Sequence, residues 1–147
     1  MPNWCSNDLF IYGEARGTAA LAISNEFDGI DFEKIIPMPP DVEASKGVPG
    51  PYPAWYEWSI QNWGTKWNAA RAERVAETPP RKRVKITFET AWGPPLPVIM
   101  ALSKQHPTCT FSLRYYERGM QFKGRLKVRA GAVLEDSTAE YRGKRGG

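Results

Sequence analysis

The chain is poor in the side chains that most often carry catalysis or bind metals. Its 147 residues include one histidine, His106, and two cysteines, Cys5 and Cys109. One histidine and two distant thiols give no zinc-ligand spacing, and no glycine-rich phosphate loop is present. Cys109 alternates with apolar residues, which is typical of an inert core thiol. The composition therefore favours a protein that is not an enzyme, holds no metal or cofactor, and keeps free thiols in the cytoplasm.

Long apolar runs are missing as well. No stretch approaches the ~20 apolar residues that a membrane span needs. The opening residues 1–5 have neither a basic lead nor an apolar run, so we expect no secretory signal and no membrane partner. Hydrophobic residues make up 41% and charged residues 24%, which is ordinary for a soluble globular protein. We expect one domain over residues 1–135, followed by a basic, flexible tail over residues 136–147.

Positive charge is scarce in the first half of the chain. Only four of the 20 Lys and Arg residues precede residue 71, whereas nine of the 16 Asp and Glu residues do. The second half is therefore strongly basic, which indicates an anionic partner. The alternative is that these cations coat a solvated face. Tryptophan is also unevenly placed, because four of the six lie between residues 55 and 67.

Hydrophobic periodicity predicts both helices and strands. The segment 37–53 is rich in proline and glycine, so we expect no regular element there. Helices are expected at residues 17–27, 54–63, 68–77 and 96–105. Strands are expected at residues 5–12, 32–36, 83–90, 109–116 and 120–129, with Met120 facing inward.

This order of elements predicts an α+β fold. It is β-α-β, an insertion, β-α-β and an extra C-terminal strand, which is the ferredoxin-like split βαβ plan with an antiparallel sheet and both helices on one face. The insertion, about residues 37–81, leaves between strands two and three. It is helical and carries most of the tryptophan, and we expect it to fold over one end of the sheet.

Four motifs resemble those of a known family. They are the opening Met-Pro-Asn-Trp-Cys-Ser-Asn-Asp-Leu of residues 1–9, Ile-Ile-Pro-Met-Pro at 35–39, Asn-Trp-Gly-Thr-Lys-Trp at 62–67, and Thr-Ala-Trp-Gly-Pro-Pro at 90–95. Together they resemble the YubB-like family of small phage and plasmid proteins with a ferredoxin-like domain. The resemblance implies the fold, a mobile-element setting and the cytoplasm of a bacterial host cell. It implies no reaction.

The motif at residues 62–67 contains the side chains that a nucleotide site needs. Trp63 and Trp67 offer ring faces on which bases stack, and Lys66 offers a compact charge for a phosphate. Asn62 and Thr65 offer polar groups that can read a base edge. The alternative is that Trp63 and Trp67 continue a helical stripe with Tyr56 and Ile60, a pattern that normally marks core.

A second group of candidates lies around the next strand. Trp92 follows this strand and precedes a proline-capped helix whose free amides attract anions. Arg81 and Arg83 precede the same strand, and we expect them to contact phosphates. We expect a concave site between the insertion and the Trp92 turn, with Lys66 in its wall. The alternative is that Trp92 plugs the end of the sheet.

These residues favour the hypothesis that the protein is a binding module, which sequesters or recognises an anionic, nucleotide-like small molecule and thereby counters host defence signalling. The most specific form of this hypothesis is the capture of a cyclic nucleotide that serves as a host immune signal. A protein inhibitor of a host defence factor is one alternative, and the sequence leaves open whether the chain is a homo-oligomer. A second alternative function is that of a nucleic-acid-binding module that uses the open sheet face. Its candidate residues are Phe10, Tyr12, Tyr116, Lys123, Arg125 and Lys127. A solvated edge strand guarded by lysines would give the same pattern.

Overall fold

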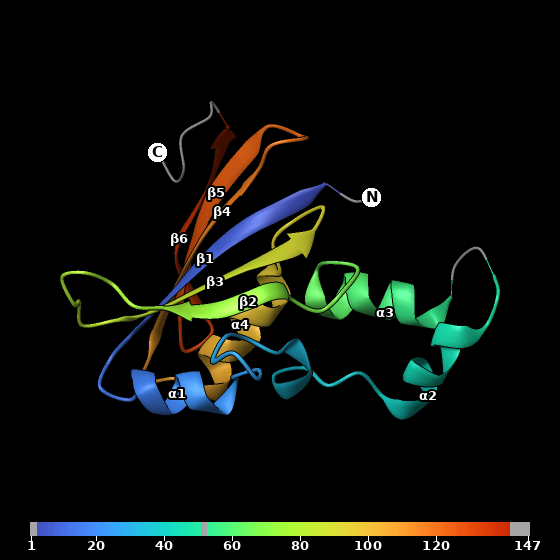
Figure 1. Cartoon of the computed structure of the whole chain (residues 1–147), viewed down its shortest axis with the longest axis horizontal. Coiled ribbons are helices and arrows are strands. Elements are labelled where there is room, and N and C mark those ends of the chain that lie inside the picture. The colour runs from blue at the N-terminus through green and yellow to red at the C-terminus, as the bar shows by residue number, and fades with distance from the viewer. Residues whose placement is uncertain (1–2, 51–52, 142–147) are drawn as a thin grey trace.

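One six-stranded antiparallel sheet lies over a layer of helices (Figure 1). The computed structural model describes residues 3–50 and 53–141. The strands follow the order β2-β3-β1-β4-β5-β6 across the sheet. Their bounds are β1 Trp4–Tyr12, β2 Ala70–Val75, β3 Val84–Ala91, β4 Thr110–Glu117, β5 Phe122–Arg129 and β6 Ala132–Glu140. The helices are α1 Arg16–Ala22, α2 Pro40–Glu43, α3 Ala54–Trp63 and α4 Leu96–Gln105, with two 3-10 helices, η1 Phe32–Lys34 and η2 Ala44–Gly47.

The central strand β1 organises the sheet. It pairs with β3 on one side and β4 on the other, both antiparallel. The segment with α1 leads from β1 to β2, and α4 leads from β3 to β4, so the order β2-β3-β1-β4 is that of a split βαβ unit. The predicted α+β ferredoxin-like class is therefore confirmed, with β5 and β6 added at one edge.

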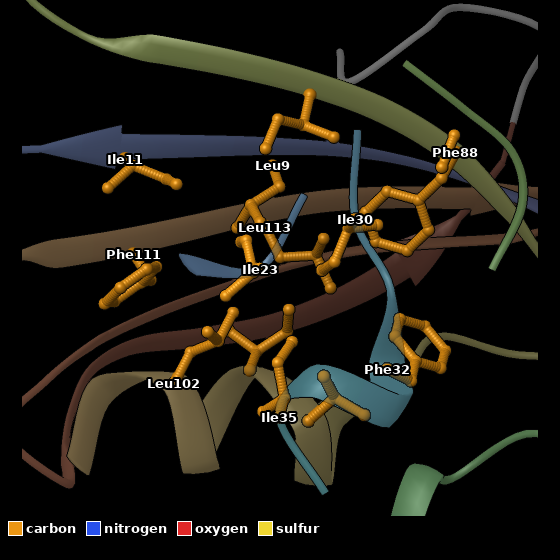
Figure 2. Packing of buried hydrophobic residues seen from close by; sticks show 14 of the residues in the cluster. Leu9, Ile11, Ile23, Ile30, Phe32, Ile35, Phe88, Leu102, Phe111 and Leu113 are labelled. Carbon is orange, nitrogen blue, oxygen red and sulfur yellow. The ribbon is translucent and has the colours of Figure 1, made fainter. Parts of the chain in front are cut away.

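The core lies between the sheet and the helices (Figure 2). Alternate residues of β1 and β4 face the helices and are fully buried, because side chains in a strand point to opposite faces in turn. The helix α4 meets them with Leu102, and the segment after α1 contributes a further apolar group. Those shown are Leu9, Ile11, Phe88, Phe111 and Leu113 from the sheet, and Ile23, Ile30, Phe32 and Ile35 from the segment after α1.

Two predicted elements have the wrong type. Residues 32–36 were expected to form a strand, but they contain η1, whose Phe32 is buried and whose cap residue Ile35 is buried too. Residues 68–77 were expected to form a helix, the type of element that their Ala, Arg and Glu residues favour. They contain β2, an edge strand that pairs with β3 through a bulge. Pairing with β3 is a long-range interaction that overrides the local preference.

The predicted insertion therefore enters at a different place. Since β2 is the second strand of the sheet, the helical insertion with α2 and α3 lies between α1 and β2, not between strands two and three. Figure 1 shows α2 and α3 extending beyond the end of the sheet. The expectation that residues 37–53 hold no regular element is also wrong. Pro40 starts α2, where its missing N–H costs nothing.

The C-terminal region differs from the prediction in two ways. Met120 was expected to face inward, but it lies in the turn before β5 and is exposed. Residues 136–140 were expected to be flexible, but they pair with β5 as part of β6. The rest of that predicted tail, residues 142–147, lies outside the described residues. No helix in the described part of the chain is long and apolar enough to cross a membrane.

Replacing Trp63 with alanine should cost about 3–5 kcal/mol of unfolding free energy, as large-to-small core changes do. Trp63 is 3% exposed, its ring packs edge-on against Phe32 and Trp58, and its Nε1 donates to the carbonyl of Ile36 at 2.9 Å. Denaturant unfolding measures the loss. The matched control is Trp67→Ala, because Trp67 is exposed and should lose much less. Equal stability of the two variants would contradict this role for Trp63.

Both thiols should be unreactive in the folded protein. Cys5 and Cys109 are fully buried, and burial together with the nearby Glu117 carboxylate raises the pKa of Cys5 to about 12. A disulfide-exchange reagent at pH 8 should therefore detect no thiol until the protein is unfolded, and two afterwards. The thiol has a higher pKa in the folded protein than in the unfolded chain, where it is 9. Its contribution to the free energy of unfolding is therefore complete below pH 9 and is lost as the pH rises towards 12. Cys5→Ala should remove this part of the alkaline loss.

Candidate functional site

A lysine surrounded by aromatic rings is the central feature of the candidate site. The Nζ atom of Lys66 lies 4.6 Å from the ring centroid of Trp67, 5.3 Å from that of Trp92 and 5.8 Å from that of Tyr56. These distances are within the range of cation–π attraction. Lys66 forms no ion pair with any carboxylate in the described residues. We refer to Lys66, Tyr56, Trp67 and Trp92 as the cation–aromatic cluster.

Backbone geometry after α3 brings this cluster together. Trp63 ends the helix, and Gly64 turns the chain in the left-handed region with a φ of 77°. The next side chain is Thr65, which is buried and donates its hydroxyl to the carbonyl of Ala91 at 2.7 Å. Because Ala91 precedes Trp92, this hydrogen bond places Lys66 beside the Trp92 turn.

Trp92 has an unusual backbone conformation. Its φ is +66°, a region that bulky residues rarely occupy. Its N–H donates to the carbonyl of Asn3 at 2.8 Å, which fixes the turn. The side chain is nevertheless 42% exposed, so the strain is not offset by burying the ring. Strain of this kind is frequent at binding sites, and here it presents an indole ring beside Lys66.

A pocket adjoins the cation–aromatic cluster and opens between the insertion and the 3-10 helix η1. Its volume is about 330 Å³, within the size range of small-molecule sites. Its two carboxylates are engaged, since Glu33 accepts from the Met38 N–H and Glu43 pairs with Lys46. Of the two lysines in this wall, Lys46 is therefore paired, whereas Lys66 lacks a carboxylate partner among the described residues. The lining residues are Glu33, Met38, Glu43, Lys46, Trp55, Ser59, Trp63, Lys66, Trp67 and Asn68.

The other residues of the motif at 62–67 serve the fold. Trp63 belongs to the core, although its edge reaches the pocket wall. Asn62 donates its side-chain amide to the carbonyl of Trp58 at 2.9 Å, within α3. Thr65 is bonded to Ala91, as described above. The polar groups of Asn62 and Thr65, expected to read a base, are therefore bonded to the backbone.

Arg81 and Arg83 lie far from the cluster. Arg83 precedes β3 and Trp92 follows it, and an eight-residue strand spans about 26 Å. The guanidinium of Arg83 donates to both carboxylate oxygens of Glu77, at 2.9 and 2.7 Å, and to the Tyr12 hydroxyl. These contacts lower the pKa of Glu77 below its ordinary value. Arg81 and Arg83, which were expected to contact phosphates at the same site, therefore lie at the opposite end of β3 from the Trp92 turn.

Several aromatic and charged neighbours of the cluster were not identified from the sequence. The ring of Trp4, at the start of β1, lies 6.0 Å from that of Trp67. The guanidinium of Arg71 lies 4.8 Å from the Trp4 ring and forms an ion pair with Glu89. Trp4 belongs to the opening motif, which was a signal of its importance. No periodicity could show that it meets Trp67, because the two are far apart in the sequence.

The open face of the sheet holds the second set of candidates. Strand alternation and register place Phe10, Tyr12, Tyr116, Lys123, Arg125 and Lys127 on the face away from the helices. Phe10 is only 5% exposed. The cationic groups of Arg83, Lys85 and Arg114 lie over its ring, at 4.1, 5.8 and 5.9 Å from the centroid. Cations therefore cover the ring that was expected to stack on a base.

Known proteins resemble the chain in fold. A family model described as "Ferredoxin-like domain in Api92-like protein" matches residues 62–145. A crystal structure of the protein api92 from Yersinia pseudotuberculosis is similar with a TM-score of 0.58 and 18% identity. The likeness covers 78% of this chain but 40% of that one, and at this identity it shows the fold alone. No curated protein matches the chain. The expected ferredoxin-like domain is thus confirmed, but the match names Api92-like proteins, not the YubB-like family.

The strain at Trp92 can be measured with two variants that both remove the indole ring. Trp92→Ala keeps a side chain in the left-handed region, whereas Trp92→Gly does not. The glycine variant should therefore be more stable than the alanine variant by about 1–2 kcal/mol, although glycine ordinarily destabilises a chain relative to alanine. Denaturant unfolding of both variants tests this. An alanine variant as stable as the glycine variant would show that the turn is not strained.

Proposed function

The chain belongs to the family of ferredoxin-like domains in Api92-like proteins, and on this scaffold we propose that it is a non-enzymatic binding module for an anionic, nucleotide-like ligand. The observation that carries the proposal is the cation–aromatic cluster, in which Lys66 is surrounded by rings and has no carboxylate partner among the described residues. Neither the family description nor the api92 structure names a reaction.

The chemistry of the cluster suits a ligand that has both a ring and a negative charge. A lysine attracted to ring faces keeps its positive charge, because the rings do not neutralise it. A phosphate can therefore pair with Lys66 without displacing a protein carboxylate. Trp67 and Trp92 are 38% and 42% exposed, and such ring surface can stack on a base at roughly 1–3 kcal/mol per base.

The adjoining pocket supplies space for such a ligand. Its volume of about 330 Å³ is at the lower end of small-molecule sites. Trp55 and Trp67 contribute apolar wall, while Asn68 adds a polar group. The side chain of Asn68 already bonds the backbone of Phe32 and the carboxylate of Asp31, so it is held in place. A preorganised wall reduces the entropy that a ligand loses on binding.

The biological form of the proposal is sequestration. In the phage or plasmid setting that the sequence resemblance implies, a small protein without catalytic groups acts by occupying a molecule that its host uses. A host signalling nucleotide has the ring and phosphate that the cluster suits, so its capture would counter host defence signalling in the cytoplasm.

Lys66→Ala should weaken binding of a nucleotide by about 1.5–3 kcal/mol, the contribution of a hydrogen bond to a charged group. Calorimetric titration with mono-, di- and cyclic nucleotides is the measurement. The matched control is Lys46→Ala, because Lys46 lines the same pocket but is already paired with Glu43. Both variants should melt close to the wild-type temperature. If no nucleotide binds more tightly than ~1 mM, about 4 kcal/mol, the proposal is wrong.

A further inference from the structure

The open face of the sheet is strongly basic along β5. Leu126 and Val128 are buried under the sheet, so the residues that alternate with them face the other way. This alternation puts four cations and no carboxylate from one strand on the open face: Lys123, Arg125, Lys127 and Arg129. Neither Lys123 nor Lys127 forms an ion pair with a residue in the described part of the chain.

The neighbouring strand β4 adds Arg114 to this surface, whereas β6 places Glu135 opposite Lys127. Arg114 on β4 lies directly opposite Arg125 on β5 and, on its other side, opposite Asp8 on β1. Further along the face, Arg83, Lys85 and Arg114 crowd over the Phe10 ring. Arg83 is paired with Glu77, and the remaining cations attract a polyanion that lies on the face.

A hollow in the surface lies between the basic face and the cation–aromatic cluster and is lined by residues that neighbour both. This hollow has a volume of about 450 Å³, and its wall includes Trp4, Ser6, Glu89 and Tyr116. At one side Tyr116 lies opposite Lys123 in the strand register. At the other side, the Trp4 ring lies 6.0 Å from that of Trp67 in the cluster. Glu89 is the carboxylate that the open face of the sheet contributes to this wall. Its ion pair with Arg71 offsets its charge.

Aromatic rings at one end and cations along the remainder form a single surface. This combination suits a single-stranded nucleic acid, because unpaired bases stack on aromatic side chains while the backbone follows a positively charged groove. A duplex offers phosphates to the cations but keeps its bases stacked inside. The exposed rings of Trp67 and Trp92 would then contribute nothing.

We infer that the nucleotide bound at the cation–aromatic cluster is one unit of a single-stranded nucleic acid, whose phosphates continue through the Trp4 hollow onto the Lys123, Arg125 and Lys127 face. The inference rests on the proposed function, because it keeps the base and phosphate at the cluster. It extends the contact surface to β4 and β5 and replaces a free nucleotide with a single-stranded nucleic acid as the ligand.

Binding of 12-residue oligonucleotides, dT12 and rU12, measured by fluorescence anisotropy over a range of salt concentrations, tests the inference. At least one should bind ten times more tightly than the corresponding mononucleotide and more tightly than a 12-base-pair duplex. For the double variant Lys123→Gln/Lys127→Gln, the salt dependence of log K should become shallower by about 1.4, since each lost phosphate contact on a single strand contributes about 0.7. Mononucleotide binding by this variant should stay within twofold of wild type.

A matched control removes the same charge from the other side of the sheet. Lys34→Gln/Lys104→Gln changes two exposed lysines of η1 and α4, and it should leave the salt dependence unchanged. Lys66→Gln should weaken the binding of both mononucleotide and oligonucleotide. If mononucleotides bind but oligonucleotides bind no more tightly, or if duplex binds as tightly as single strand, the inference is wrong and the proposed function stands. If neither ligand binds, both fail.

Discussion

The hydrogen bond from Thr65 to the carbonyl of Ala91 determines where the insertion meets the sheet. Both residues are buried, and the bond is 2.7 Å long. Gly64 makes it possible, because the left-handed turn after α3 sends the chain back towards β3. A Cβ at Gly64 would lie 2.7 Å from the Cδ atom of Pro97, so no larger residue fits there without movement. The placement of α3, the cation–aromatic cluster and the adjoining pocket depend on this junction.

The junction creates a site from groups that have little individual significance. A lysine on a surface is usually solvated, and an exposed tryptophan is often an incidental feature. Here Lys66 and Trp92 lie on either side of the β2–β3 hairpin in the sequence, yet the ammonium lies 5.3 Å from the ring. The strained backbone at Trp92 and the rigid turn at Gly64 mean that the fold bears the cost of the arrangement before any ligand arrives.

Local signals in the sequence predicted the elements that local interactions determine. The helices at 54–63 and 96–105 were predicted with the bounds that the structure has, because proline precedes each one and apolar spacing runs through it. The segment 68–77 failed since its composition favours a helix, and only its pairing with β3 makes part of it a strand. Periodicity cannot report a partner that lies elsewhere in the chain.

The same limit applies to the site. Residue chemistry selected Lys66, Trp67 and Trp92, and the structure brings these three together. It also selected Arg81 and Arg83, because both precede the strand that leads to Trp92. The length of that strand separates them from the cluster, and adjacency in sequence was mistaken for adjacency in space.

The last strand, β6, has a consequence for how the protein behaves in concentrated solution. It forms one edge of the sheet and every residue in it is exposed, so one side of its backbone is available to a neighbouring strand. Two copies meeting edge to edge would bring together the carboxylates of Glu135, Asp136 and Glu140 from each molecule. Their mutual repulsion opposes the growth of a continuous intermolecular sheet. We therefore expect the acidic edge to oppose edge-to-edge aggregation.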